Sequence, residues 1–392
     1  MKKTLLLAAV AAVMCSCTPK ASDHVGLKDV FEGKFVVGTA LNASQIMERN
    51  AAEDSLIRLH FNAIVPENCM KHAEIHPQED VWDFDLADKF VEYGEKNNMW
   101  ITGHCLVWHS QCAPWMFVDE NGNDVSPEVL KQRMKDHIST VVGRYKGRIK
   151  GWDVVNECIV EDGSYRNSGY YRILGEEFIP WAFECAHEAD PDCELYLNDY
   201  GMNVPGRRDA YVKLIKLLKD RGCRIDAIGM QSHVGIDYPD FDEYVASMEA
   251  FIGAGVNVMV TEWDMSANPT QTQSADVAET QRLRREMWHA TPEQRDSILN
   301  ELRPRLCPYM DGLPDSVATV WNDRVKKMFD IYEAHAEHFT RFTAWGVTDA
   351  TSWKNGFVCP GGVDYPLLFD RQNNAKGVVN DLIEEFKNKK KQ

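Results

Sequence analysis

The chain has 392 residues, of which 44% are apolar, and its 60 Asp and Glu outnumber its 43 Lys and Arg to give a formal net charge of −17. This apolar content is above that of disordered chains, so we expect a folded protein with a sizeable core. A nucleic-acid-binding protein needs a basic surface that displaces counterions. The one lysine-rich stretch, 387–391, is typical of a solvated helix end, so no nucleic acid partner is expected.

The first residues have the pattern of an export signal. Two lysines precede the apolar run Leu5–Met14, which is too short to span a bilayer. Ser16 then precedes Cys17, and a small residue before a cysteine resembles a bacterial lipoprotein processing site. We expect 1–22 to be a signal peptide and tether, Cys17 to carry the lipid, and the protein to be exported to the cell envelope, periplasmic or at the cell surface. An ordinary signal peptide cut after Ala21 is the alternative.

The cysteines give no sign of a metal or redox motif. The sequence contains 11, two of them in the signal segment, and no pair is spaced as Cys-x-x-Cys. This disfavours a zinc ribbon or a thioredoxin-like site. The odd number that remains leaves at least one thiol free, and pairings cannot be read from the sequence.

Short runs rich in Val, Ile, Phe and Trp alternate with longer segments of helical period, which predicts βα units and a parallel sheet. The expected helices include Pro127–Tyr145, Arg208–Arg221 and a closing helix Val378–Phe386. Eight such units favour a single catalytic domain, 23–392, with the α/β fold of a (β/α)8 TIM barrel. The expected strands are Phe35–Ala40, Asn62–Pro66, Trp100–Trp108, Ile149–Asn156, Glu194–Asp199, Ala227–Ser232, Asn257–Glu262 and Phe342–Thr348.

One segment interrupts this alternation. Between the seventh strand and the helix before the eighth lie extra residues, about 268–319, with helix-like stretches at Ala278–Trp288 and Pro292–Leu302. No Gly/Ser-rich or Pro-rich linker flanks them, so we interpret the segment as a loop insertion rather than a domain.

Carboxylates stand at the ends of apolar strands, where catalytic residues of such barrels lie. Glu157 follows the fourth strand and Glu262 ends the seventh, so the two are expected to face each other across the barrel mouth. Glycoside hydrolysis needs such a pair, and like charges facing each other keep one carboxyl protonated. Asn156 is placed to bind a sugar 2-hydroxyl. Strand alternation allows a hydrogen-bonded chain Asp264–His233–Glu262 that holds Glu262 ionised.

Seven strand-end motifs, in this order, resemble glycoside hydrolase family 10, the xylanase family of the retaining (β/α)8 clan. The resemblance runs from about Phe31 to Phe386. The motifs are Pro66–Lys71, Gly103–His109, Trp152–Glu157, Leu197–Gly201, Gly229–His233, Val260–Asp264 and Trp345–Asp349.

The resemblance implies a retaining endo-1,4-β-xylanase that acts on xylan or xylo-oligosaccharides, as a monomer and without a cofactor or metal. Glu157 is implied as the acid/base and Glu262 as the nucleophile, supported by His233. His109, Asp153 and Asp264 are implied as orienting residues, and Tyr200 as a platform on the aglycone side. The residues implied for the glycone side are Glu67, Asn68, Lys71, His104, Trp108, Asn156, Gln231, Trp345 and Trp353.

Two departures from the family pattern stand out. Trp263 replaces an aliphatic residue beside Glu262, at a position that is expected to point away from the site. The insertion begins on the catalytic face and, by walling off one end of a cleft, would make the enzyme exo-acting or specific for short xylo-oligosaccharides.

Other interpretations of the same residues stay open. A β-glucanase of the same clan and a non-catalytic glycan-binding protein are the alternative functions. The two glutamates could form structural ion pairs, the site tryptophans could be core, and His104, His109 and His233 could be metal ligands. His72 and His76 are expected at the surface.

Overall fold

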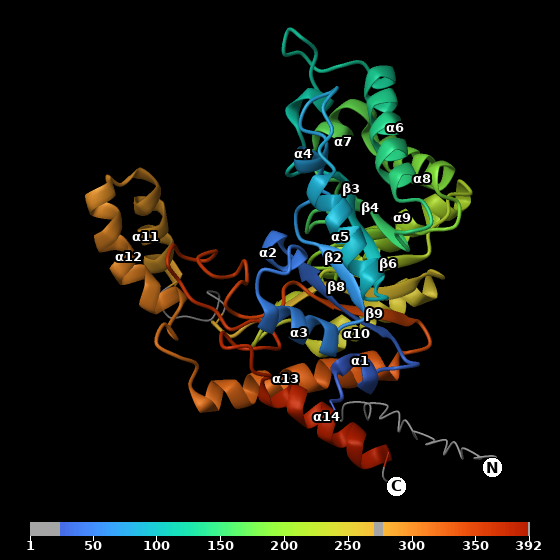
Figure 1. The fold of residues 1–392 in the computed structure, drawn as a ribbon. Coiled ribbons are helices and arrows are strands. Elements are labelled where there is room, and N and C mark those ends of the chain that lie inside the picture. The colour runs from blue at the N-terminus through green and yellow to red at the C-terminus, as the bar shows by residue number, and fades with distance from the viewer. Residues whose placement is uncertain (1–23, 270–276, 391–392) are drawn as a thin grey trace, which may run out of the picture.

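The computed structural model describes residues 24–269 and 277–390. Eight of its strands form a closed ring in which every neighbouring pair is parallel (Figure 1). The ring runs β1 to β6, then β8 and β9, and closes where β9 pairs with β1. The strands are β1 (Val36–Leu41), β2 (Ala63–Pro66), β3 (Trp100–Trp108), β4 (Gly151–Asn156), β5 (Glu194–Asp199), β6 (Ala227–Met230), β7 (His233–Gly235), β8 (Asn257–Ser266) and β9 (Phe339–Ala344).

Helices follow the strands and surround the ring, so the predicted (β/α)8 TIM barrel is confirmed. They begin where the sequence places capping residues; Ser126 Oγ, for example, accepts a hydrogen bond from Val129 N at the start of α6. The longer helices are α3 (Ala51–His60), α5 (Asp85–Lys96), α6 (Pro127–Arg144), α8 (Phe178–Ala189), α9 (Pro205–Asp220), α10 (Phe241–Gly253), α11 (Val277–His289), α12 (Pro292–Leu306), α13 (Asp315–Ala334) and α14 (Gly377–Lys390). The shorter ones are α1 (Leu27–Val30), α2 (Ala43–Ile46), α4 (His72–Ile75), α7 (Gly169–Leu174) and the 3₁₀ turns Pro114–Met116 and Gly175–Glu177.

Several strand boundaries differ from the prediction. The strand predicted at Asn257–Glu262 continues as β8 to Ser266 because its end pairs with β7, and the sixth and eighth strands differ as well. The sixth strand stops at Met230 because Ser232 has a positive φ of 61°, and the chain resumes as the short strand β7, which pairs with the end of β8. The eighth strand, β9, starts at Phe339 and ends at Ala344. Its Arg341 is buried in the barrel, where Nη1 donates to Thr102 Oγ1 at 2.6 Å, a use of arginine that an apolar pattern cannot reveal.

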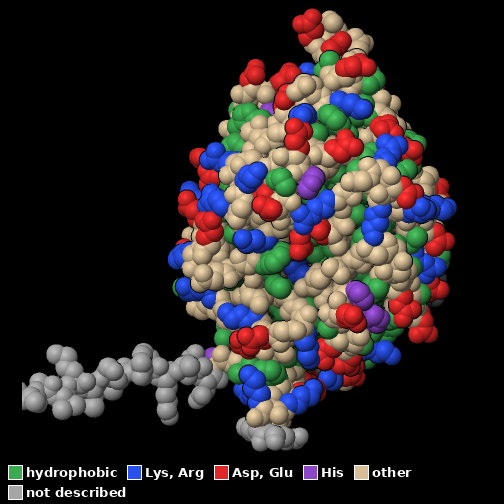
Figure 2. Space-filling model, turned by 90° about the vertical axis from the view of Figure 1, so that its right-hand side faces the viewer, with side chains coloured by type: hydrophobic (Ala, Val, Ile, Leu, Met, Phe, Trp, Pro, Cys, Tyr) green, Lys and Arg blue, Asp and Glu red, His purple; other side chains and the backbone are tan. Residues whose placement is uncertain are grey.

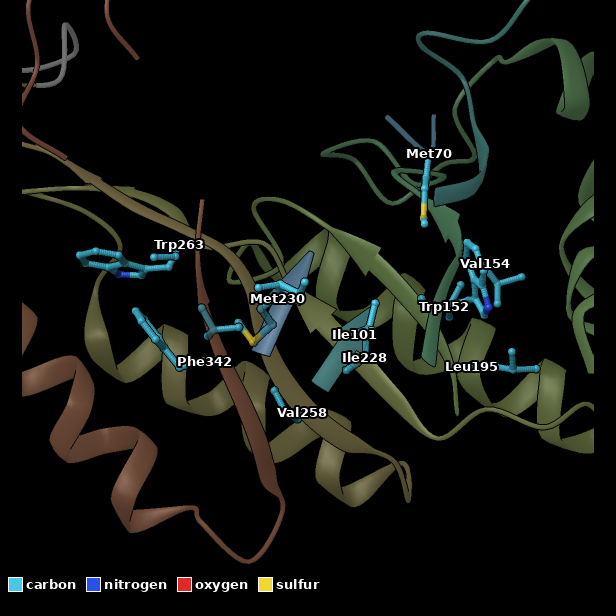
Figure 3. Close-up of a cluster of buried hydrophobic side chains, with 14 of the residues drawn as sticks. Met70, Ile101, Trp152, Val154, Leu195, Ile228, Met230, Val258, Trp263 and Phe342 are labelled. Atoms are coloured by element: carbon cyan, nitrogen blue, oxygen red, sulfur yellow. The ribbon is translucent and has the colours of Figure 1, made fainter. Parts of the chain in front are cut away.

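The core fills the layer between barrel and helices. Trp263 points into this layer, away from the cavity that the strand ends form, as expected. Its ring lies beside Phe342 (Figure 3), with centroids 5.5 Å apart, and 6.0 Å from Trp321 of α13. The aromatic side chain therefore bridges the strand that carries Glu262 and the outer helix.

The insertion folds as the helical pair α11 and α12, which stands apart from the barrel in Figure 1. The pair has its own small core, in which Leu283, Leu302 and Leu306 pack with Cys359 from the loop after β9. Arg303 Nε also donates to Pro360 O at 2.9 Å. The insertion therefore supports the loop that follows β9.

The prediction of a surface position for His72 and His76 is wrong. They are 4% and 2% exposed, because Trp82 stacks on the His76 ring at 3.5 Å and His137 of α6 packs against both. All nine cysteines of the described residues carry free thiols.

The surface and the termini add two observations. Acidic and basic side chains are interspersed over the face shown in Figure 2. Within 24–269 and 277–390, no helix has both the length and the hydrophobicity to cross a membrane. The expected signal peptide and Cys17 lie outside the described residues.

Candidate active site

A cavity of about 800 Å³ lies at the carboxyl ends of the barrel strands. Strand ends and the loops that follow them supply its walls, which is where barrels of this kind place their chemistry. It brings together every residue predicted to be catalytic or substrate-binding: Glu67, Asn68, Lys71, His104, Trp108, Asn156, Glu157, Tyr200, Gln231, His233, Glu262, Trp345 and Trp353.

Glu262, on β8, is 5% exposed and receives its hydrogen bonds from nitrogen atoms. Asn198 Nδ2 donates to its Oε1 at 2.7 Å, and His233 Nε2 lies 3.2 Å from its Oε2. Burial by itself would raise the pKa of Glu262, but the contacts with His233, His104 and Asn198 outweigh burial and hold the pKa below its ordinary value. The carboxylate is therefore ionised at neutral pH.

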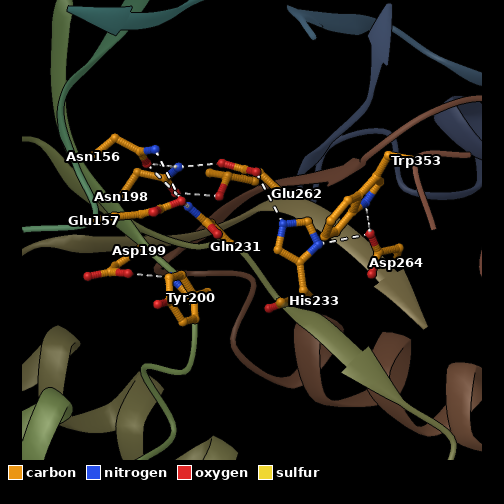
Figure 4. A network of polar contacts seen from close by, with 12 residues as sticks. Asn156, Glu157, Asn198, Asp199, Tyr200, Gln231, His233, Glu262, Asp264 and Trp353 are labelled. Carbon is orange, nitrogen blue, oxygen red and sulfur yellow. Dashed lines mark hydrogen bonds and ion pairs between the residues drawn. The ribbon is translucent and has the colours of Figure 1, made fainter. Parts of the chain in front are cut away.

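His233 is held by a carboxylate behind it. Its Nδ1 lies 2.8 Å from Asp264 Oδ2, to which Trp353 Nε1 also donates at 2.7 Å (Figure 4). Lys354 Nζ lies 3.1 Å from the other oxygen, Oδ1. Burial lowers the pKa of His233, but Asp264 and Glu262 more than reverse this and raise it to about 9. The structure therefore contains the expected Asp264–His233–Glu262 chain, with a protonated imidazole in the middle.

Glu157 follows β4 in a left-handed backbone conformation, with φ at 56°. Its N–H donates to Asn198 O at 2.9 Å, and its carbonyl oxygen accepts from Arg166 Nε at 2.7 Å, which fixes the turn. Gln231 Nε2 donates to Oε1 at 3.1 Å, and His109 Nδ1 lies 3.8 Å from Oε2. The side chain keeps 14% of its surface exposed, so a proton donor here can still reach a substrate.

Three amide side chains connect the two glutamates. The Asn156 amide lies 2.9 Å from Asn198 Nδ2 and 3.2 Å from Gln231 Nε2. Asn198 in turn contacts Glu262, and Gln231 contacts Glu157, so one polar chain spans adjacent strands beneath both carboxylates (Figure 4). Such a network fixes the carboxylates in place before any substrate binds.

The predicted glycone-side residues hold one another in position. Lys71 Nζ donates to Asn68 Oδ1 at 3.0 Å and to Gln111 Oε1 at 2.9 Å, and it lies 4.8 Å from the centre of the Trp108 ring. Burial raises the pKa of Glu67, against the lowering effect of Lys71. A lysine fixed in this way presents a hydrogen-bond donor to a sugar hydroxyl rather than a free charge.

His104 and the tryptophans form the remainder of that wall. His104 Nδ1 lies 2.8 Å from Asp153 Oδ2, and both side chains are 2% exposed, so the carboxylate orients the imidazole. The Trp345 ring meets His104 edge-on at 5.4 Å, and Trp353 meets Phe357 at 4.4 Å. Phe357 lines the cavity and is 63% exposed, which extends the aromatic wall outward.

On the opposite side, Tyr200 is fixed from two directions. Arg166 Nη2 donates to its hydroxyl at 3.1 Å, and the Arg207 guanidinium lies 4.3 Å from its ring centre. Asp199 accepts from Tyr200 N at 2.8 Å and from Tyr211 OH at 2.5 Å. Burial raises the pKa of Asp199 to about 7, in spite of Arg207. The aromatic face of Tyr200 is therefore a rigid surface in the cavity.

Among the residues that had no predicted role, Asn198, Gln111, Arg166 and Lys354 contact the predicted site residues directly. Asn198 ends a barrel strand and Lys354 follows Trp353, so position along the chain could have indicated them. Gln111 and Arg166 lie in loops, and only the folded chain shows that they contact Lys71 and Glu157.

The insertion does not line the cavity with any residue that the structure describes. It packs instead behind the loop that carries Trp353 and Phe357, through Cys359 and Arg303. An insertion that closes one end of the cleft is therefore not seen in the described part of the chain.

Comparison with known proteins identifies the family. The family model of glycosyl hydrolase family 10 matches residues 26–385. The chain belongs to glycosyl hydrolase family 10. One relative within this family, the endo-1,4-beta-xylanase A of Xylanibacter ruminicola, is 44% identical over 384 residues, which cover 97% of both chains. The endo-1,4-beta-xylanase of Geobacillus stearothermophilus is 34% identical over 93% of this chain and 97% of that one.

Solved xylanase structures agree with this fold. A GH10 endoxylanase retrieved from sugarcane soil metagenome superimposes with a TM-score of 0.82 at 39% identity, covering 92% of this chain and 99% of the other. The intracellular xylanase TsXylA of Thermoanaerobacterium saccharolyticum, in a mutant complex with xylotriose, gives a TM-score of 0.76 at 32% identity over the same shares.

Proposed function

We propose that this chain is a retaining endo-1,4-β-xylanase that hydrolyses internal β-1,4-xylosidic bonds of xylan. The observation that carries the proposal is the pair Glu157 and Glu262, joined by one amide network and opening into one cavity. The family 10 relatives that cover nearly the whole chain are named endo-1,4-beta-xylanases, and a structural neighbour was solved with xylotriose.

The mechanism that fits these groups is double displacement. Glu262 attacks the anomeric carbon while Glu157 gives its proton to the departing glycosidic oxygen, which leaves a glycosyl-enzyme. Glu157 then takes a proton from water, the resulting hydroxide displaces Glu262, and the sugar leaves with its original configuration. Because the second step restores the proton to Glu157, the cycle needs no other proton source and no cofactor.

The surroundings of the two carboxylates support these roles. Glu262 is more buried and accepts from His233 and Asn198, which stabilises its anionic form. Glu157 accepts amide hydrogen bonds only on Oε1, from Gln231 at 3.1 Å and from Asn156 at 3.5 Å, and it keeps more exposed surface, which suits a group that gains and loses a proton in each cycle. Environments that differ in this way separate a nucleophile from an acid/base.

The tryptophans favour xylose over glucose. A glucose residue differs from xylose by an added hydroxymethyl group, and the bulky rings of Trp345 and Trp353 would collide with that group at the glycone end.

The described part of the insertion leaves the cavity open, which supports cleavage within long chains over exo-action. One chain supplies every residue of the site, and we infer a monomer.

The first test is the product profile of the purified protein on glucuronoxylan, arabinoxylan and carboxymethyl-cellulose. We expect a ladder of xylo-oligosaccharides from both xylans and no product from cellulose. Glu262→Ala should lose activity by roughly 10⁴-fold or more, whereas the exposed Glu301→Ala should retain it. Release of xylose or xylobiose alone would show that the enzyme is exo-acting rather than endo-acting. If neither xylan is hydrolysed, the assignment of xylan as the substrate is wrong.

We also propose that the protein is exported and anchored to the cell envelope through a lipid on Cys17. The basic start, the short apolar run and the small residue before Cys17 support this. Cys17→Ser should move the expressed protein from the detergent phase to the aqueous phase in a detergent-partition assay. Cys15→Ser is the matched control and should stay in the detergent phase; equal partition of both variants and the parent would contradict the anchor.

A further inference from the structure

Three imidazole rings lie together in the fold, outside the cavity. His72 begins α4, His76 follows its last residue, and His137 comes from the middle of α6. None of the three is more than 4% exposed. One nitrogen from each ring can be chosen so that all three lie within 4.8 Å of one another, and within the described residues this is the one group of its kind.

His76 already has the orientation of a metal ligand. Its Nε2–H donates to Glu79 O at 2.9 Å, so the lone pair lies on Nδ1. Metal-bound histidines usually donate their second N–H to a carbonyl in this way. His76 Nδ1 lies 3.2 Å from His137 Nδ1. Two nitrogen ligands on a tetrahedral ion, at about 2.0–2.1 Å from the ion, lie about 3.3 Å apart.

Two further ring nitrogens lack a partner. His72 Nε2 and His137 Nε2 are buried and make no hydrogen bond, and of the two only His72 Nε2 is free to bind an ion that His137 holds through Nδ1. Buried polar atoms without partners are rare in folded proteins and call for an explanation such as an ion.

We propose that His72, His76 and His137 form a binding site for a divalent transition-metal ion of the zinc class. The donor set is all nitrogen, which suits Zn²⁺, Co²⁺ or Ni²⁺ and disfavours Mg²⁺ and Ca²⁺, which take oxygen ligands. The carboxylates of Glu79, Asp80 and Asp136 lie near His76, and their charges would offset part of the charge of an ion.

Binding requires two local changes. His137 Nδ1–H donates to His76 Nδ1, so His137 must move this proton to its Nε2 before Nδ1 can bind an ion. His72 Nδ1 accepts a hydrogen bond from Ala113 N at 3.1 Å, which leaves the proton on Nε2. To bind the ion through Nε2, His72 must move that proton to Nδ1 and give up the bond to Ala113. The loss of two neutral hydrogen bonds, from Ala113 to His72 and from His137 to His76, is small beside the gain of three metal–nitrogen bonds.

The site would connect two parts of the barrel. His72 follows directly after Lys71, which lines the cavity, whereas His137 lies on α6 between β3 and β4. A bound ion would therefore fix the segment after β2 to α6 and, through it, the Lys71 side of the glycone wall. This role is independent of the proposed function, because it acts on stability whatever the substrate.

The test uses the full chain after treatment with a chelator and removal of that chelator. Titration with ZnCl₂ in a calorimeter should show one ion per chain, and thermal unfolding should shift upward with Zn²⁺ but not with Mg²⁺ or Ca²⁺. His76→Gln should weaken binding by at least about 100-fold and abolish the shift. The exposed His187→Gln is the matched control and should behave as the parent does.

A second variant and a spectroscopic measurement distinguish loss of the metal site from a failure of the first variant to fold. His72→Phe keeps an aromatic ring against His137 and should also lose Zn²⁺ binding. Co²⁺ bound to the parent protein should show the visible absorption of a tetrahedral nitrogen site, which needs no variant. Absence of stoichiometric binding, absence of that absorption, or equal binding by His76→Gln and the parent would overturn the proposal and leave a purely structural histidine cluster.

Discussion

At the scale of single residues, Glu157 and Glu262 differ in what contacts them. Glu262 is buried and contacts Asn198 and the protonated His233, which keeps it anionic, whereas Glu157 is more exposed and accepts only from neutral amides. Most of this local chemistry could be predicted, because each motif lies in a few consecutive residues. The contacts of Gln111 and Arg166 could not, because they join loops far apart in the sequence.

The assignment of the two roles predicts opposite products when azide replaces the lost carboxylate. With an activated aryl xyloside, Glu157→Ala should give the β-xylosyl azide, because azide attacks the glycosyl-enzyme that Glu262 still forms. Glu262→Ala should give the α-xylosyl azide, because azide attacks the substrate directly from the vacant side. NMR of the products distinguishes them, and the reverse pattern would exchange the two roles.

His233 predicts a pH dependence of stability. Its folded pKa of about 9 lies above the ordinary 6.5, so the protonated form favours folding. This contribution, up to about 3 kcal/mol, is complete below pH 6.5 and is lost as the pH rises through 9. Measured by denaturant unfolding, the free energy of unfolding of the parent should fall as the pH rises through 9. His233→Gln should not show this part of the fall.

The exposed His338→Gln provides the control and should follow the parent at each pH. Asp199, whose pKa is raised to about 7, titrates in the same range in all three proteins, so the difference between variant and parent isolates His233. Parallel curves for His233→Gln and the parent would show that the imidazole is not charged in the folded protein.

At the scale of elements, the insertion shows what pattern can and cannot reveal. Its two helices were predicted, and the structure has them as α11 and α12. Their partner was not predicted, because Cys359 lies after β9 and only the fold brings it to Leu302. The prediction that His72 and His76 lie at the surface was wrong for the same reason. His137, which packs against both, lies on a different helix.

Because the insertion supports the loop after β9, a substitution in the insertion should weaken substrate binding even though the insertion does not line the cavity. Leu302 is fully buried in the small core that contacts Cys359, so Leu302→Ala should loosen the loop that holds Trp353. We expect KM for xylo-oligosaccharides to rise roughly three- to tenfold, for about 1 kcal/mol of binding lost, with kcat nearly unchanged. The exposed Glu301→Ala on the same helix should leave KM as it is, and an unchanged KM for Leu302→Ala would contradict the role.

At the scale of the whole molecule, strand number and closure followed from the sequence because each barrel strand is a short apolar run. The end of β6 and the start of β9 did not, since they depend on the positive φ of Ser232 and on the buried Arg341. The regular alternation thus predicts the fold, and its exceptions are features that the packed barrel imposes.

The contact between barrel and outer helix predicts which side chains stabilise the whole fold. Trp321 of α13 is 1% exposed, packs on Trp263 and donates to Met265 O at 2.7 Å. Trp321→Ala should lower the free energy of unfolding by about 3–5 kcal/mol, measured by denaturant unfolding. Its neighbour Val320, which is 53% exposed, is the control, and Val320→Ala should change it by less than about 0.5 kcal/mol. Equal effects would show that α13 is only loosely attached.

The left-handed backbone of Glu157 sets activity against stability. A glutamate with φ at 56° is strained by about 1–2 kcal/mol, and asparagine adopts that conformation more readily. Directed evolution that selects for heat resistance alone would therefore favour asparagine at position 157 and discard the proton donor. A thermostabilisation campaign on this barrel must select for turnover in every round, because its acid/base residue is also one of its strained positions.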